Sequence, residues 1–69
     1  MSDYSFGKVT AVITYKGRKI ETVESPMQVV YAVDGNYASA YWSIADAERA
    51  IRGARTTYLP VDVRHWFGK

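Results

Sequence analysis

The sequence contains no cysteine. This absence excludes disulfide bonds and thiolate metal sites, which often stabilise very small domains. No apolar run approaches the roughly 18 residues that a membrane-spanning helix needs. The amino-terminal residues MSDYSFGK also lack the apolar core of a signal peptide. We therefore expect a soluble, cytoplasmic protein without membrane contact.

An excess of one charge is also missing. The formal net charge is only +2, and basic and acidic residues are mixed along the chain without blocks of one sign. A nucleic-acid-binding domain usually carries a denser basic patch. The charge thus permits an acidic partner without requiring one.

Residue patterns that carry chemistry are scarce. The one histidine, His65, is interpreted as an exposed or edge residue, and the five glycines do not form a phosphate-binding loop. No metal-ligand spacing occurs. The carboxylates that the sequence places at turns, caps or the surface are Glu21, Glu24, Asp34, Asp46, Glu48 and Asp62. The sequence predicts no catalytic residue, no metal, no cofactor and no small-molecule substrate, and hence a protein that is not an enzyme.

The clearest element is a short amphipathic helix over residues 43–53. Ser43 is a suitable N-cap, Asp46 follows it at capping-box spacing, and Gly53 provides a left-handed stop. At 100° per residue one narrow arc collects the apolar side chains of Ile44, Ala47, Ala50, Ile51 and Ala54. An alanine-rich stripe of this kind is suited to close packing on a sheet.

Residues 6–24 predict a first β-hairpin. Phe6 to Tyr15 alternates in polarity, Lys16-Gly17 forms the turn, and Arg18 to Glu24 returns. A two-residue turn sets Ile13 opposite Ile20, Ala11 opposite Thr22 and Val12 opposite Glu21. We expect the Ile13/Ile20 face to be buried. The face expected in water carries Lys8, Thr10, Thr14, Lys19 and Glu21.

Residues 27–42 predict a second hairpin, because Ser25-Pro26 interrupts the first. Met27 to Val33 and Asn36 to Trp42 flank Asp34-Gly35, a type I′ turn signature. This register sets Val33 opposite Asn36, Tyr31 opposite Ala38, Val29 opposite Ala40 and Met27 opposite Trp42. We expect the helix on that face. The reverse face, with Tyr37 and Tyr41, is too apolar to be purely solvated.

Residues 54–69 leave two alternatives open: a short fifth strand near residues 61–66, or a tail that packs Trp66 and Phe67 on the domain. The predicted fold is therefore one α+β domain over residues 1–69. It has an antiparallel four-stranded sheet made of two β-hairpins, one helix on one face, and a C-terminal segment that adds a fifth strand in one alternative.

The segments YKGRKIETVE, VVYAVDG and YWSIADAERAIRG together resemble many short proteins of bacteriophages and prophages. These proteins share a strand beginning Y-x-G, a hairpin closing at a D-G turn and a serine-capped helix ending A-x-x-A-I. The resemblance covers Tyr15 to Gly53 and excludes LPVDVRHWFGK. It implies a bacterial or phage source and an accessory role in binding a host protein or nucleic acid. It transfers no functional residue.

For function, the sequence favours a non-enzymatic module that binds a protein, either a host protein or a second copy of itself. The predicted contact residues are Tyr37, Tyr41, Trp66 and Phe67, because interfaces favour aromatic side chains. The alternative is a nucleic-acid-binding accessory factor. It would use Arg49, Arg52 and Arg55 on the helix together with the tyrosine face of the sheet.

Overall fold

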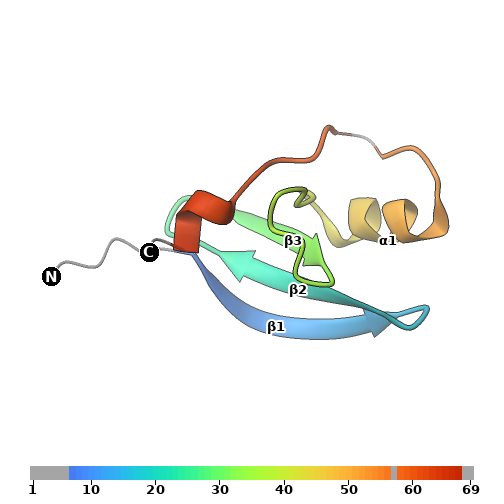
Figure 1. Ribbon diagram of the computed structural model, residues 1–69, viewed down its shortest axis with the longest axis horizontal. Helices are drawn as coiled ribbons and strands as arrows, with labels where there is room; N and C mark the ends of the chain where they lie inside the picture. Colours follow the sequence, from blue (N-terminus) through green and yellow to red (C-terminus); the bar gives the residue numbers. More distant parts are fainter. Residues whose placement is uncertain (1–6, 57, 68–69) are drawn as a thin grey trace, which may run out of the picture.

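A computed structural model describes residues 7–56 and 58–67. Phe6, the predicted start of the first strand, lies outside these residues, as do Gly68 and Lys69 of the C-terminal segment. Figure 1 shows a twisted antiparallel sheet, a helix beside it and a long return of the chain. The elements are β1 (Lys8–Tyr15), β2 (Arg18–Glu24), β3 (Val29–Val33), α1 (Ile44–Arg52) and a short 3-10 helix, η1 (Arg64–Phe67).

The first hairpin has the predicted register. Ile13 pairs with Ile20, Ala11 with Thr22 and Val12 with Glu21. The turn residues Lys16 and Gly17 both have positive φ, at 52° and 77°, as a two-residue type I′ turn requires. Nearer the start of β1, a β-bulge between Val9 and Ala11 shifts the register by one residue.

The sheet has three strands in the order β1-β2-β3, so the predicted four-stranded sheet is wrong. The predicted fourth strand is reduced to one bridge, in which Tyr31 pairs with Tyr41 and not with Ala38. Asp34 and Gly35 do adopt positive φ, at 54° and 75°, but the chain does not return directly. The amides of Asn36, Tyr37 and Ser39 donate to Val33, Gly35 and Asn36 respectively. These successive local turns use the hydrogen-bonding groups that a fourth strand needs.

The C-terminal segment also pairs at a single point. Ala40 and Val61 exchange backbone hydrogen bonds of 2.8 and 2.9 Å, after which the chain runs to η1. There Trp66 is buried and Phe67 packs against the core. The C-terminal segment thus combines one isolated bridge with a tail that covers the sheet (Figure 1).

The two faces of the sheet are covered by different parts of the chain. One face packs against the C-terminal segment through a cluster of Val23, Val30, Ala32, Ala40, Val63 and Trp66. The opposite face carries Ile20 and Val33, and α1 packs there with Ala47 fully buried. The helix lies on the predicted Val33 face of β3, but Ala40, predicted on that face, is buried in the opposite cluster, and Tyr41, predicted on the reverse face, lies on the helix side. The face of the first hairpin that was predicted to lie in water is part of the core on β2. Val23, which lies on the same face as Glu21, is a central core residue.

Strand β1 lies outside this double cover. Ile20 is buried, but its partner Ile13 is exposed, as are all β1 residues from Lys8 to Thr14. The helix spans only nine residues, about 14 Å, and packs mainly against β3 and β2. The predicted burial of the Ile13/Ile20 face is therefore correct for β2 and wrong for β1.

The helix has the predicted caps. The Ser43 hydroxyl accepts a hydrogen bond of 3.1 Å from the Asp46 amide, and Gly53 ends the helix with φ 84°. The sequence did not show that Asp46 is buried, where the Arg49 guanidinium donates to its carboxylate at 3.0 Å. Within residues 7–56 and 58–67, no helix is long and apolar enough to cross a membrane.

Candidate functional site

Three of the four predicted contact aromatics hold the C-terminal segment on the sheet. Trp66 is only 6% exposed, and its carbonyl accepts a hydrogen bond of 2.9 Å from the Gly7 amide. The rings of Tyr37 and Phe67 lie 4.5 Å apart between centroids. These contacts give the residues a structural role, and their predicted role in binding a partner stays a prediction.

Tyr37 is also held by its hydroxyl, which donates a hydrogen bond of 2.5 Å to Glu21 on β2. This bond to a carboxylate, reinforced by partial burial and the negative charge of Glu21, raises the pKa of Tyr37 to about 12. The phenol therefore stays protonated at neutral pH, and its hydrogen bond links the loop after β3 to the sheet.

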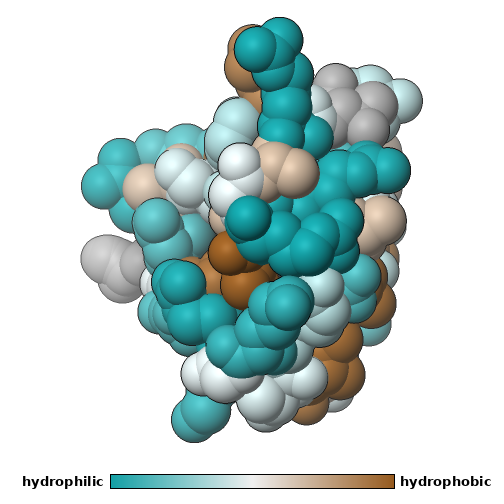
Figure 2. Space-filling model, turned by 90° about the vertical axis from the view of Figure 1, so that its right-hand side faces the viewer, coloured by the Kyte–Doolittle hydropathy of each residue, from teal (hydrophilic) through white to brown (hydrophobic). Residues whose placement is uncertain are grey.

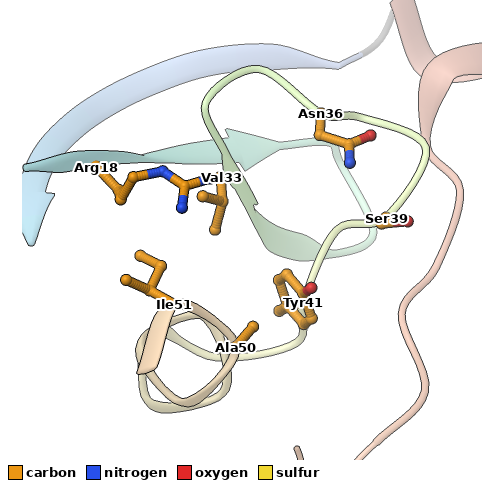
Figure 3. A pocket seen from close by; sticks show the side chains of 7 residues that line it. All are labelled: Arg18, Val33, Asn36, Ser39, Tyr41, Ala50 and Ile51. Atoms are coloured by element: carbon orange, nitrogen blue, oxygen red, sulfur yellow. The ribbon is translucent and has the colours of Figure 1, made fainter. Parts of the chain in front are cut away.

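The fourth predicted aromatic, Tyr41, lines a cavity between β3 and α1 (Figure 3). Its other lining residues are Arg18, Val33, Asn36, Ser39, Ala50 and Ile51. The volume is about 130 Å³, whereas pockets for drug-sized ligands measure roughly 300–1,000 Å³. Arg18, at its rim, is paired with the carboxylate of Asp34. The cavity holds a few waters at most, and we assign it no ligand.

The helix arginines are partly engaged within the chain. Arg49 pairs with buried Asp46, and Arg52 donates a hydrogen bond of 2.9 Å to the Tyr15 hydroxyl. Arg55 is exposed beyond the end of the helix. With Tyr37 packed on Phe67, the two surfaces of the nucleic-acid alternative are each partly occupied by the protein's own side chains. That alternative stays a prediction.

The large exposed apolar side chains lie elsewhere, at positions that the sequence patterns did not single out. Trp42 and Tyr58 line a groove of about 480 Å³, and Leu59 follows Tyr58. We call these three residues the aromatic groove. Their exposed fractions are 40% for Trp42, 61% for Tyr58 and 86% for Leu59. One signal was available: Leu59 is a large apolar residue in a connection, where no alternating pattern gives it an inward side.

One wall of the aromatic groove lies next to backbone that is hydrogen-bonded to the sheet. Trp42 directly follows Tyr41, whose amide and carbonyl each make a hydrogen bond of 2.7 Å with Tyr31 of β3. On the other side, the Thr56 hydroxyl donates a local hydrogen bond of 2.9 Å to the Tyr58 carbonyl, and Val61, three residues after Tyr58, is bonded to Ala40. The Trp42 wall is thus tied to the edge of the sheet.

A second exposed apolar area runs along β1, with Val9, Val12 and Ile13 as its largest members. Figure 2 views the end of the molecule that carries the Lys16-Gly17 turn. Hydrophilic residues dominate this end, and apolar side chains gather at its lower right, at the level where β1 lies in Figure 1.

In the part of the chain that the structure describes, no three histidine or carboxylate side chains lie close enough together to hold a metal ion. Asp62 has its pKa lowered to about 2 by hydrogen bonds from the side chain and the amide of Arg64. This carboxylate orients the start of η1.

Comparisons of the chain with known protein families, with curated proteins and with solved structures find no match.

Proposed function

We propose that the protein is a small non-enzymatic binding module that acts through contact with another protein, and that the aromatic groove is its contact surface. The observation that supports this proposal is the exposure of Trp42 and Tyr58 on one groove, with exposed Leu59 next to Tyr58 in the sequence. Single exposed apolar residues are ordinary in soluble proteins. Adjacent exposed aromatic and aliphatic side chains that form a groove are typical of interaction sites.

The residue types and their support also suit this role. Tryptophan and tyrosine are enriched among the residues that dominate binding free energy. Because Tyr41 is hydrogen-bonded to Tyr31 in the sheet extension, the backbone beside Trp42 needs little ordering when a partner binds. Lower ordering cost of this kind raises affinity. An apolar segment of a partner, such as the hydrophobic face of a helix, would fit a groove lined in this way.

The test is capture from a lysate of the source organism with the immobilised protein, followed by mass spectrometry. Three baits are compared: the unmodified chain, the Trp42→Ser/Leu59→Ser double variant and the Met27→Ser variant. Met27 is a matched control, because it is highly exposed but lies in the turn between β2 and β3. Affinities for any captured protein are then measured by calorimetry.

We expect one protein to be retained by the unmodified chain and by Met27→Ser. The double variant should bind it at least about 30-fold more weakly, the effect of losing hot-spot side chains. Equal retention by all three baits would contradict the assignment of the groove. Specific capture of nucleic acid, lost when Arg52 is replaced by Glu, would instead favour the nucleic-acid alternative.

A further inference from the structure

The outer edge of β1 is a second candidate for a contact surface. β1 is the outer strand in the order β1-β2-β3, so only one of its two edges is paired among the described residues. The two-residue turn after Tyr15 makes Tyr15 and Arg18 a hydrogen-bonded pair. By alternation, Ile13 also directs its amide and carbonyl toward β2, whereas Val12 and Thr14 direct theirs outward. The outer edge thus presents regular, unpaired backbone groups.

This edge lacks most of the features that keep natural edge strands from pairing with other chains. Such strands usually carry charges or proline, or are short. From Val9 to Thr14 β1 contains neither a charge nor a proline, and the strand is eight residues long. Its β-bulge lies near the amino-terminal end, between Val9 and Ala11, which leaves the second half regular.

Both faces of β1 are also open. Val9, Val12 and Ile13 are 40%, 52% and 42% exposed, although Val12 and Ile13 point to opposite faces of the sheet. No described element therefore overhangs the strand, and a second strand can approach its edge without displacing part of the fold. Pairing would cover apolar area on both faces at once.

The sequence of β1 matches itself when it is reversed. A two-fold axis perpendicular to the sheet at Val12 sets Val12 opposite Val12 of the other copy. The same axis sets Ala11 opposite Ile13 and Thr10 opposite Thr14, so that apolar residues meet apolar residues and threonine meets threonine. The outward groups of Val12 meet the outward groups of the other Val12, as a hydrogen-bonded antiparallel pair requires, whereas Thr10 lies at the β-bulge.

The neighbouring registers are worse. An axis at Ala11 sets Thr10 opposite Val12 and Lys8 opposite Thr14. An axis at Ile13 sets Val12 opposite Thr14 and Thr10 opposite Lys16. Both mix polar with apolar partners. Closed dimers need a patch that is complementary to itself, and the Val12 register provides one. The net charge of +2 per chain is small, but the Val12 register also brings Lys8 toward Lys16 of the other copy at each end, where like charges oppose pairing.

We propose that β1 is the interface of a homodimer, in which two copies pair antiparallel about Val12 to form a continuous six-stranded sheet. A dimer would also add buried apolar area, which matters because a 69-residue chain without disulfides buries a small core. This inference does not depend on the aromatic groove, and Trp42→Ser/Leu59→Ser should leave the dimer intact.

The first test is the mass in solution, by sedimentation equilibrium. We expect twice the chain mass of 7.8 kDa for the unmodified protein. Val12→Lys places two ammonium groups opposite each other at the axis and should weaken association at least about tenfold. Val29→Lys is the matched control, because Val29 is an exposed strand valine on β3, and it should remain dimeric.

A charge rescue and a cross-link make the test specific for the register. Val12→Lys mixed with Val12→Glu should form a heterodimer. Because the chain has no cysteine, Val12→Cys adds a single thiol that lies opposite its copy at about 5.5 Å between Cα atoms, within disulfide range. Mild oxidation should give a covalent dimer with Val12→Cys and none with Val29→Cys.

The second test also protects against a folding defect in the lysine variant, since valine and cysteine are similar in size. A monomer at millimolar concentration for the unmodified protein would overturn the proposal. So would a folded Val12→Lys protein that remains fully dimeric, or equal cross-linking at positions 12 and 29.

Discussion

The Tyr37 hydroxyl donates a hydrogen bond of 2.5 Å to the Glu21 carboxylate and so joins the loop after β3 to the middle of β2. The same loop is also held by a hydrogen bond of 2.8 Å from the Val63 amide to the Tyr37 carbonyl and by packing of the Tyr37 ring against Phe67. The contact joins residues that are 16 positions apart, and neither was marked for this role by a sequence pattern.

Replacing Tyr37 with Phe should lower the free energy of unfolding by about 1 kcal/mol at neutral pH, because one hydrogen bond to a charged acceptor is lost. The pKa of Tyr37 rises from 10 to about 12 on folding. Its contribution is therefore complete below pH 10 and is lost as the pH rises through about 12.

Urea unfolding of both proteins between pH 8 and pH 11.5 measures this difference, and absorbance at 295 nm follows the phenol itself. The Tyr58→Phe variant is the control, because Tyr58 is exposed and this variant keeps the hydrogen bond from Tyr37 to Glu21, so its stability should match that of the unmodified protein. A Tyr37 phenol that titrates near pH 10 would contradict the contact.

The two tryptophans should behave in opposite ways. Replacing Trp66 with Ala removes a buried side chain from the main core and should cost about 3–5 kcal/mol of stability. Replacing Trp42, which is partly exposed, should cost less than about 1 kcal/mol. Thermal and urea unfolding compare the two variants directly.

Fluorescence tests the burial of the two tryptophans with substitutions that keep an aromatic ring at each position. Trp42→Phe leaves only Trp66, whose emission should lie at short wavelength and resist quenching by iodide. Trp66→Phe leaves Trp42, whose emission should shift to longer wavelength and be quenched readily. The same emission and quenching from both variants would show that the C-terminal segment does not pack on the sheet.

Substitution of Gly7 should lower the stability of the fold, because there is no room for a side chain at this position. A Cβ atom added there would lie 2.6 Å from the Cβ of Trp66, so Gly7→Ala has to displace the end of the C-terminal segment. We expect a loss of about 1–3 kcal/mol in urea unfolding, typical of overpacking.

Gly17 is the matched comparison, since nothing lies within 4 Å of its added Cβ. Gly17→Ala meets only the conformational cost of φ 77°, about 1 kcal/mol. The near-ultraviolet signals of Trp66 should change for Gly7→Ala alone. An unchanged Trp66 environment in Gly7→Ala would refute the close approach.

Asp62 should titrate well below an ordinary aspartate. Hydrogen bonds from Arg64 lower its pKa to about 2 from 3.8. Because the folded pKa is lowered, the contribution of this carboxylate to stability is present above pH 3.8 and is lost as the pH falls through about 2. Both side chains are largely exposed, so we expect the midpoint to move toward 3.8 at high salt.

Carboxyl chemical shifts followed by NMR from pH 1.5 to 6 measure this midpoint. In the Arg64→Gln variant the pKa of Asp62 should return most of the way toward 3.8. A midpoint that does not move in this variant would contradict the assigned contact.

Local signals account for the parts of the fold that were predicted correctly. The helix follows from Ser43 and Gly53, because a capping hydroxyl and a left-handed glycine act within one turn of the backbone. The register of β1 and β2 follows from Lys16-Gly17, because a two-residue turn sets every pair that follows it. Both kinds of information lie within a few residues in the chain.

Only the tertiary structure decided how the rest of the chain was placed. The Asp34-Gly35 turn has its expected conformation, but the residues between this turn and Ala40 fold into local turns. Ala40 then pairs with Val61, which is 21 positions away. Burial of Trp66 on the Val23 face likewise made that face the core and left β1 uncovered. These outcomes depend on competition between distant apolar segments for one small sheet, and alternation within a single strand does not encode which segment covers it.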